Sequence, residues 1–494
     1  MNPRWQKILI IAGGILLVYL LWWRLKLGVE RYFDIDEFAH MHWSFNIFRG
    51  FRPYTDFFDL FPPFLSYILY PLWAIFGNPI TVLVEARVMM FVFFVLLSGV
   101  VFLIAKGSPP AGGGILGGLL SVIILSFLPI PYDKLLEIRP DLIATFFAFL
   151  GMYFFVKRHY LFSGVCYATG IGFVPKVVFF LPAILLVFLF LWMKEKRKDL
   201  IRKVLGWGMG FLIPLSILGM VLVLSGDVVG SFLLITKIPS DVQTALSNAY
   251  NHNFYMFPSH FFWQNQTYYG LGDKENFPYV VNLIVWISGS VWGVVRLVGF
   301  LSKEKTSDQA AGLLLSSSFI FNFVAFTHIF PMKHAQYLIT LVPFVAFYFA
   351  DIVVTILQTL RKRNLEYVGV LVIFLLYIVV LKTTIDMNTP KSLWTNENDL
   401  KNIRKIVQVV PSGSYVFDLS GQSLVYRDSY YICCLPYGQY IDVLPKLPSL
   451  RESLERTQTK YVFNARLGTL PEEDSRYVTE TYKVPLADGL ILSR

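Results

Sequence analysis

Charged residues and cysteines are both scarce in this chain. Only 15% of its 494 residues are charged, and it contains 3 cysteines. A soluble domain carries roughly 25% charged residues, so this composition argues against an ordinary soluble enzyme. Three cysteines exclude a disulfide scaffold, and a hydrophobic fraction of 55% excludes a disordered chain. The composition therefore indicates a polytopic membrane protein.

Long apolar runs, which need about 20 residues to cross the hydrocarbon core, predict the membrane region. The first run, Ile8 to Trp23, is followed by further spans and by no small-residue cleavage site, so we expect an uncleaved first helix. The run 161–193 is interpreted as two spans, 161–175 and 176–193, the alternative being one long helix kinked around Pro175. Together the runs predict about eleven spans. The others are expected near 80–104, 112–130, 141–156, 204–224, 278–298, 311–328, 336–357 and 367–383.

The basic loops predict the orientation. With these spans, every strongly basic loop, such as 194–203 and 361–363, lies on the same side as the N-terminus. The positive-inside rule places that side in the cytoplasm, so we expect an integral protein of the cytoplasmic (inner) membrane. The net charge of +10 is thereby explained without a nucleic-acid partner. The segments expected outside are 24–79, 131–140, 225–277, 329–335 and 384–494.

The chain changes character near residue 385, where short apolar runs begin to alternate with Pro, Gly and charges. We predict a membrane domain, 1–384, followed by a small α/β extracytoplasmic domain, 385–494. A helix is expected over Asn402–Val410, ending before Pro411. The short apolar runs are Tyr415–Phe417, Tyr461–Phe463 and Leu490–Leu492.

The cysteines are expected to be unpaired. Cys433 and Cys434 are adjacent, and because vicinal disulfides are strained we expect two free or buried thiols. Cys166 lies within a predicted span, where a small apolar packing role is expected.

The first external segment contains an acidic cluster at a membrane boundary, made of Asp34, Asp36, Glu37 and His40. Such clusters are candidate functional sites. On a helix Asp36 and Glu37 point about 100° apart, so one can perform chemistry while the other holds structure. The alternative is an acidic helix N-terminus stabilised by the helix dipole.

The same segment continues with an aromatic, acidic and proline-rich run that ends at Pro62-Pro63. We expect an interfacial helix pair here, with Asp56 and Asp59 three residues apart on one helix face. A solvated acidic face explains the two aspartates equally well.

Four cations also lie in outward-facing positions. Arg139 precedes Pro140 at the start of a span and either binds phosphate or pairs with Glu137 or Asp141. Lys176 either contacts a lipid phosphate or extends its amine to the membrane surface. Lys333 and His334 suit an anionic headgroup or serve as a membrane anchor.

The ordered set of motifs resembles the GT-C superfamily of integral-membrane glycosyltransferases. It comprises one N-terminal span, Asp36-Glu37, the run Tyr54–Asp59, Pro62-Pro63 and Arg139-Pro-Asp141. The similar families are the lipid A aminoarabinose transferases, the lipopolysaccharide-core galacturonosyltransferases and, more distantly, the protein O-mannosyltransferases. The resemblance covers about 380 residues of membrane region and implies an α-helical polytopic fold.

The resemblance also implies an activity. Such enzymes move a sugar from a polyprenyl-phosphate donor, embedded among membrane lipids, to a glycolipid, polysaccharide or protein acceptor. Asp36 is implied as the general base on the acceptor hydroxyl, with inversion at the anomeric carbon. Glu37 is implied to orient a neighbour or to bind the sugar or a metal. The residues expected to bind the donor phosphate or the substrate are Asp56, Asp59, Arg139, Lys176, Lys333 and His334.

Two features depart from or extend this pattern. Many relatives have a Lys before the Pro-Pro pair, where this chain has Phe61, so another cation must replace it. Some relatives bind a divalent ion with an acidic residue and a His from the long loop. His252 or His260 could supply that ligand, although their spacing matches no metal template, so a metal is possible but not assigned.

Two other function classes fit parts of the sequence. A transporter or lipid flippase predicts ionisable residues in the middle of spans, whereas Asp351 and Lys382 are expected near span ends. A membrane receptor that binds ligand through its tail leaves the acidic external segment unexplained.

Overall fold

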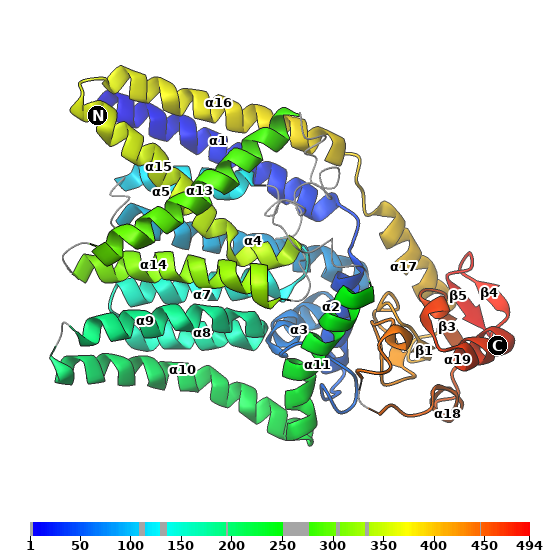
Figure 1. Ribbon diagram of the computed structural model, residues 1–494. Coiled ribbons are helices and arrows are strands. Elements are labelled where there is room, and N and C mark those ends of the chain that lie inside the picture. The colour runs from blue at the N-terminus through cyan, green and yellow to red at the C-terminus, as the bar shows by residue number, and fades with distance from the viewer. Residues whose placement is uncertain are drawn as a thin grey trace.

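The polypeptide forms a bundle of apolar helices with a small mixed sheet at one end (Figure 1). The computed structural model describes residues 3–107, 114–128, 136–193, 196–249, 276–302, 307–330, 335–444 and 446–494.

Each of the predicted spans coincides with a helix of the bundle. Eight of the described helices are long and apolar enough to cross a membrane. Three further predicted spans are shorter apolar helices, and a fourth short apolar helix, α3, lies in the predicted external segment 24–79. The long helices are α1 (Pro3–Glu30), α4 (Pro79–Gly107), η1 with α9 (Pro175–Phe180, Leu181–Trp192), α10 (Arg197–Ser225), α13 (Phe277–Ser302), α14 with η3 (Ser307–Val324, Ala325–Ile329), α15 (Val342–Lys362) and α16 (Glu366–Lys391). The shorter ones are α3 (Phe64–Phe76), α5 (Gly114–Phe127), α7 (Pro140–Val156) and α8 (Tyr160–Phe173).

The break between α8 and α9 lies where the sequence predicts it. Helix α8 ends at Phe173, the extended Val174 follows, and η1 begins at Pro175. Because Pro cannot donate a backbone hydrogen bond and disfavours helix in the preceding residue, two helices form instead of one.

Helix α8 packs closely against α10 because glycines face the contact. A Cβ added to Gly164 would lie 2.1 Å from the Trp207 carbonyl oxygen, and one added to Gly210 would lie 2.0 Å from that of Leu161. Small residues of this kind let helix backbones approach where no hydrophobic effect drives association.

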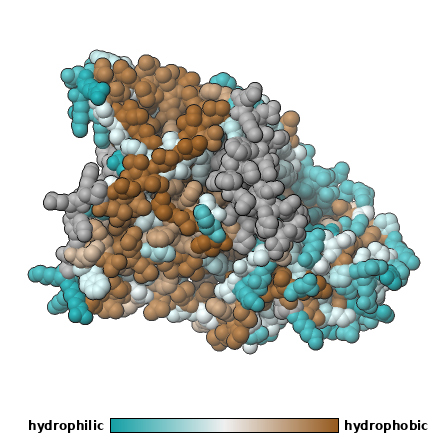
Figure 2. Space-filling model, viewed as in Figure 1, coloured by the Kyte–Doolittle hydropathy of each residue, from teal (hydrophilic) through white to brown (hydrophobic). Residues whose placement is uncertain are grey.

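The outer surface of the bundle is apolar. Ile15 of α1 is 69% exposed, Leu212 of α10 60% and Ile287 of α13 55%. Figure 2 shows hydrophobic side chains over the bundle and hydrophilic ones over the C-terminal sheet. Exposed apolar surface on this scale is typical of contact with lipid, so the protein is an integral membrane protein.

The C-terminal region (residues 397–494) contains a five-stranded sheet of order β2-β1-β3-β5-β4. Strand β1 pairs in parallel with β2 and β3, whereas β5 pairs antiparallel with β3 and β4. The predicted helix is confirmed, and the three short apolar runs coincide with strands β1, β3 and β5. The elements are α17 (Glu397–Val409), β1 (Tyr415–Phe417), β2 (Arg427–Asp428), η5 (Tyr437–Gln439), α18 (Leu450–Arg456), β3 (Tyr461–Phe463), η6 (Leu467–Thr469), α19 (Glu472–Thr481), β4 (Val484–Leu486) and β5 (Ile491–Ser493).

Three helices lie at the end of the bundle that faces the C-terminal region: α2 (Ile35–Phe48), α3 and α11 (Val228–Ala249) (Figure 1). Helices α2 and α3 flank the acidic and proline-rich run 49–63, which is itself not helical. Asp56 and Asp59 therefore do not share a helix face, and that prediction is wrong. The run instead forms turns, with an isolated bridge between Pro53 and Phe57.

Candidate active site at the start of helix α2

The acidic cluster opens helix α2 through a capping box. Asp34 is the N-cap, and its carboxylate accepts a hydrogen bond from the Asp36 backbone N–H at 3.0 Å. Glu37 reciprocates by accepting from the Asp34 backbone N–H at 2.8 Å. These bonds satisfy amide groups that a helix start leaves unpaired, so the helix dipole alternative explains part of the cluster.

Glu37 is buried and holds α2 against the bundle. Its carboxylate binds the Arg87 guanidinium of α4 through two contacts, Nε–Oε1 at 2.8 Å and Nη2–Oε2 at 2.6 Å. It also accepts from the Ile138 backbone N–H at 3.0 Å, and its exposed fraction is 0%. A carboxylate with all these partners and no exposed surface is a structural anchor of α2.

Asp36 points the other way and remains accessible. Its side chain is 49% exposed, and its Oδ2 lies 2.7 Å from Nη1 of Arg139. Arg139 also contacts Asp34 at 3.0 Å and Glu137 at 2.6 Å, so one guanidinium serves three carboxylates. Glu137 in turn pairs with Arg31 at the end of α1. The sequence left open whether Arg139 binds phosphate or pairs with Glu137 or Asp141. The structure shows that Arg139 pairs with Glu137, and also with Asp34 and Asp36 of the acidic cluster.

His40 lies one turn after Asp36 and is electrically neutral. Burial lowers the pKa of His40 from 6.5 to about 4, against the opposing effect of the Asp36 carboxylate. Its ring packs against Phe61, with centroids 5.0 Å apart, and against Trp43 at 5.3 Å. Phe61 therefore supplies an aromatic wall beside the cluster.

Lys176 begins η1 and faces the start of α7. Its amine pairs with Asp141 and lies 4.2 Å from the ring centroid of Tyr337. Because Asp141 follows Arg139 by two residues, the fold brings Lys176 to the same end of the bundle as Asp36. Lys333, His334, His252 and His260 lie outside the described residues.

Asp56 and Asp59 have separate environments. Asp56 pairs with Arg52 at 3.3 Å on the surface. Asp59 is buried and accepts from the Phe61 backbone N–H at 2.9 Å, and burial raises the pKa of its carboxyl to about 8. Burial therefore favours the protonated form of this turn residue.

A cavity of about 1340 Å³ separates the run 51–56 from α11 and the C-terminal region. Asp56 lies on its wall, and charges of both signs line it. The charged lining residues are Asp56, Asp227, Lys237, Asp428, Asp442, Lys446 and Arg456.

The sequence analysis missed the contact that joins α2 to the C-terminal region. His42 binds the Leu424 carbonyl oxygen through Nδ1 at 2.9 Å and the Asp428 carboxylate through Nε2 at 2.8 Å. Asn46, one turn later, donates to the other Asp428 oxygen at 2.8 Å. Burial lowers the pKa of His42, but the Asp428 carboxylate outweighs burial and raises it to about 8. The only sequence signal was a pair of polar residues spaced i, i+4 on an apolar helix.

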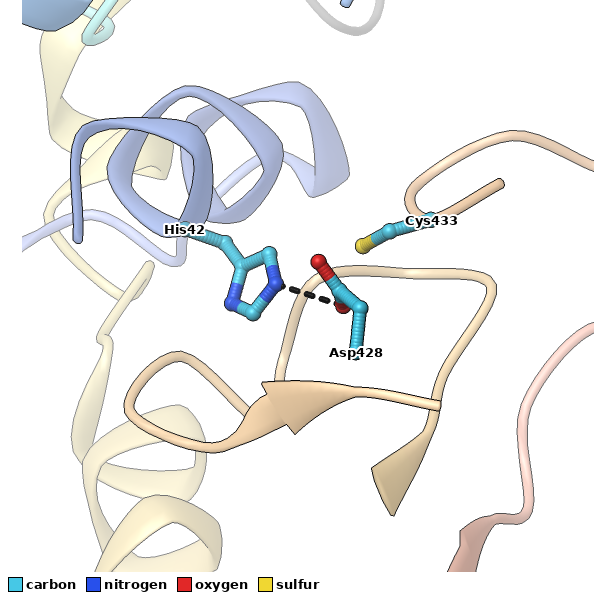
Figure 3. A group of neighbouring side chains, drawn as sticks. All are labelled: His42, Asp428 and Cys433. Carbon is cyan, nitrogen blue, oxygen red and sulfur yellow. Dashed lines mark hydrogen bonds and ion pairs between the residues drawn. The ribbon is translucent and has the colours of Figure 1, made fainter. Parts of the chain in front are cut away.

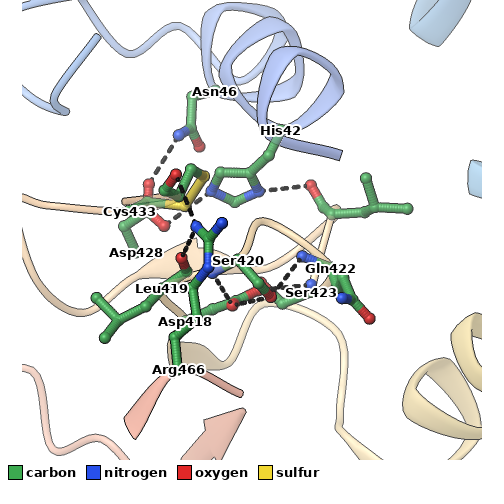
Figure 4. Close-up of a disulfide and its surroundings, with 12 residues drawn as sticks. His42, Asn46, Asp418, Leu419, Ser420, Gln422, Ser423, Asp428, Cys433 and Arg466 are labelled. Carbon is green, nitrogen blue, oxygen red and sulfur yellow. Dashed lines mark hydrogen bonds and ion pairs between the residues drawn. A yellow bond between two sulfur atoms is a disulfide. The ribbon is translucent and has the colours of Figure 1, made fainter. Parts of the chain in front are cut away.

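The expectation of two free thiols is wrong, because Cys433 and Cys434 form a disulfide (Figure 4). Cys434 has a left-handed backbone (φ 69°), which turns the adjacent side chains toward each other. Both cysteines are buried in an apolar cluster with Ala39 and Trp43 of α2. Cys166 is buried and unpaired, as predicted.

This disulfide also decides whether the neighbouring residues suit a metal. Nε2 of His42, a carboxylate oxygen of Asp428 and Sγ of Cys433 lie within 4.8 Å of one another (Figure 3). A disulfide sulfur is no thiolate ligand, and Asp428 already binds both His42 and Asn46. In the part of the chain that the structure describes, this donor set does not fit a divalent ion.

Comparison with known proteins identifies the fold. No protein-family model and no curated protein sequence matches this chain. Two crystal structures of ArnT from Cupriavidus metallidurans do match. With the one bound to undecaprenyl phosphate, the TM-score is 0.56 at 10% identity, over 100% of this chain and 98% of ArnT. With the apo form, the TM-score is 0.54 at 11% identity, over the same shares of the two chains. This chain is therefore a polytopic membrane protein with an ArnT-like fold and a small C-terminal sheet.

Proposed function

We propose that this protein is an inverting glycosyltransferase that moves a sugar from a polyprenyl-phosphate donor to a hydroxyl of a cell-envelope acceptor. The observation that supports the proposal most is the full-length similarity to a structure that holds undecaprenyl phosphate, combined with the accessible Asp36 carboxylate at one end of the bundle.

The described residues supply what such a reaction needs. Displacement at the anomeric carbon requires a base near the acceptor hydroxyl and cations near the leaving phosphate. Asp36 is the accessible carboxylate of the cluster, and it accepts the hydroxyl proton as the new glycosidic bond forms. The sugar–phosphate bond breaks in the same step, and the polyprenyl phosphate leaves with the bonding electrons.

Arg139 and Lys176 are the cations proposed to meet the donor phosphate. Both are now paired with carboxylates, Arg139 with Asp36 and Lys176 with Asp141. A phosphate that binds Arg139 competes with Asp36 for the guanidinium, so donor binding frees the base. This exchange couples the two halves of the reaction without a large movement.

The proposed setting is the outer face of the cytoplasmic membrane. The N-terminus is then cytoplasmic, and α2 with the C-terminal region is extracytoplasmic. The acceptor class is a glycolipid, a polysaccharide or a protein.

The test uses the full-length protein in nanodiscs with a radiolabelled polyprenyl-phosphate sugar and envelope acceptor. We expect labelled product of inverted anomeric configuration from wild type, and almost none from Asp36→Asn. Asp386→Asn, which removes the carboxylate of the exposed Lys382 pair at 2.6 Å, is the matched control and retains activity. Full transfer by Asp36→Asn would reject Asp36 as base.

One observation favours the second candidate, a transporter or lipid flippase. Asp351, expected near a span end, instead lies in the middle of α15, is 1% exposed, and binds Arg296 of α13 at 2.6 Å. That expectation is wrong because α15 extends to Lys362. Trp292 also donates to Asp351, at 2.7 Å. Because Asp351 is held by both Arg296 and Trp292, the ion pair resembles a fixed structural contact more than a transport site. Substrate flux into liposomes with no covalent product would favour transport over transfer.

A further inference from the structure

Another cavity, of about 720 Å³, lies between α8 and the first turns of α10. Helix α10 begins at the end of the bundle away from the C-terminal region and runs toward α11 (Figure 1). Helix α8 begins at the same end, because α7 leads to it from Pro140, which lies next to the acidic cluster. The cavity is therefore separated from Asp36 and its cations by the length of the bundle.

The lining of this cavity is strongly cationic. Its charged members are one carboxylate, Asp199, and the cations Arg158, Lys196, Arg202 and Lys203. Apart from Lys203, these cations form no ion pair with a carboxylate among the residues that the structure describes. The cations at the other end of the bundle, Arg139 and Lys176, are both paired with carboxylates. The cavity thus has a surplus of positive charge that the protein itself does not neutralise.

The packing of α8 on α10 fixes the shape of the cavity. The two helices touch at Gly210, where an added Cβ would lie 2.0 Å from the Leu161 carbonyl oxygen. One turn earlier, a Cβ added to Gly206 would meet no atom within 4 Å, so the space beside this lining residue is open. Lys203 of α10 reaches across this space, with its amine 5.7 Å from the ring centroid of Tyr160 of α8. The cations are therefore presented around a gap between two packed helices.

An apolar stripe continues from the cavity along the outside of α10. Arg202 is followed at helical spacing by Leu205, Met209 and Leu212, so the four side chains share one face of the helix. The three apolar side chains are each more than half exposed. From Arg202 to Leu212 the helix rises about 15 Å, which is half the thickness of the hydrocarbon core. The face therefore offers cations at one level and apolar surface over the depth of one lipid leaflet.

We propose that this cavity binds an anionic glycerophospholipid, with the phosphate of the headgroup among the cations and an acyl chain along the stripe that ends at Leu212. Basic pockets between membrane helices attract anionic headgroups, and a guanidinium can bind a phosphate through two parallel hydrogen bonds. A soluble anion would neutralise the cations but leave the apolar stripe without a partner. The inference goes beyond the proposed function and does not depend on it, because the cavity lies at the opposite end of the bundle from Asp36.

The first test measures lipid affinity of the full-length protein by native mass spectrometry, with phosphatidylglycerol, zwitterionic phosphatidylcholine and soluble glycerophosphate as probes. Wild type should bind phosphatidylglycerol most tightly, and the double variant Arg158→Gln, Arg202→Gln should bind it about 10- to 30-fold more weakly. The control Arg361→Gln, Lys362→Gln removes the same charge from the last turn of α15, outside the cavity, and should bind as wild type does. Equal weakening in the two double variants overturns the proposal, because the attraction would then be that of any basic surface. Equal affinity of wild type for phosphatidylglycerol and for either of the other two probes also overturns it.

The second test fills the cavity without removing charge. Gly206→Phe should weaken the binding of phosphatidylglycerol several-fold, because its ring occupies the open space beside α10. The matched control is Gly208→Phe, which also has no atom within 4 Å of an added Cβ but lies two residues later, about 200° around the helix. Equal binding by the two variants overturns the proposal.

A third measurement needs no variant. Phosphatidylglycerol with a photoreactive diazirine on its acyl chain is bound to wild type and illuminated, and mass spectrometry of the peptides locates the attachment. We expect attachment concentrated on the stripe of α10 from Leu205 to Leu212. Attachment spread evenly over the outer helices of the bundle overturns the proposal.

Discussion

Asp36 and Glu37 are neighbours in sequence, but they belong to two different faces of α2. Glu37 is 0% exposed and is bound to Arg87 inside the bundle, whereas the Asp36 side chain is 49% exposed where α2 meets the C-terminal region. Consecutive helix positions point about 100° apart, so one residue fixes the helix and the next one faces outward. Of the two adjacent carboxylates, one is therefore a buried structural anchor and the other is accessible.

The largest expected effect comes from breaking the buried anchor. Glu37→Gln leaves the Arg87 charge buried without its partner, which costs roughly 3–5 kcal/mol. We expect a strongly lowered melting temperature or failure to accumulate in the membrane. Glu455→Gln, which breaks an exposed pair with Arg451, is the control and should melt as wild type does. A wild-type melting temperature in Glu37→Gln would show that Glu37 does not anchor α2 to the bundle.

The buried carboxyl of Asp59 gives the next largest effect, and its sign is set by pH. Burial raises the pKa of Asp59 from 3.8 to about 8, so the folded protein binds a proton that the unfolded chain releases. Stability is then lost as pH rises from about 4 to about 8, by up to about 1.4 kcal/mol per pH unit. Asp59→Asn removes this loss. Chemical denaturation at pH 5 and pH 8 measures the free energy of unfolding. The difference between Asp59→Asn and wild type should shift in favour of the variant at pH 8, and the variant should retain transfer activity. A variant that folds but loses transfer would instead support substrate binding by Asp59.

The contact between α2 and the C-terminal region should respond to pH in the range near neutrality. The pKa of His42 is raised from 6.5 to about 8, so its stabilisation is present below pH 6.5 and lost as pH rises through 8. The rise corresponds to roughly 2 kcal/mol. We expect the melting temperature of wild type to fall between pH 6.5 and pH 9. Asp428→Asn should be lower at pH 6.5 and should fall less over this range, because Asp59 still titrates in it but His42 no longer gains a partner. Equal pH dependence in the two proteins would show that the protonated His42–Asp428 pair does not stabilise the fold.

The smallest effect is expected on the exposed surface. Asp56→Asn breaks the pair with Arg52, whose side chain is 55% exposed, and exposed pairs contribute less than about 1 kcal/mol. Stability should stay within error of wild type. Transfer that falls sharply in this stable variant would place substrate in the cavity that Asp56 lines.

Much of the fold could be predicted from the sequence, because apolar runs and proline are local signals. The predicted spans match helices, the break at Pro175 lies where expected, and the short apolar run Tyr461–Phe463 forms β3. The irregular run 49–63 was misassigned to helix, because aromatic and acidic spacing does not reveal turns.

The site could be predicted only in part. Asp36 and Arg139 stand out as residues at a membrane boundary, but nothing local shows that they bind each other. Glu37 and Arg87 are 50 residues apart, and His42 and Asp428 are 386 apart. Such contacts arise from helix packing and from the docking of the C-terminal region, which periodicity does not encode.

The most direct test of the account measures transfer and stability together in Asp36→Asn. The account predicts a melting temperature close to that of wild type and a kcat lowered by roughly 100-fold or more, the contribution of a general base. A folded Asp36→Asn protein that transfers sugar at the wild-type rate would contradict the assignment of chemistry to the outward face of α2.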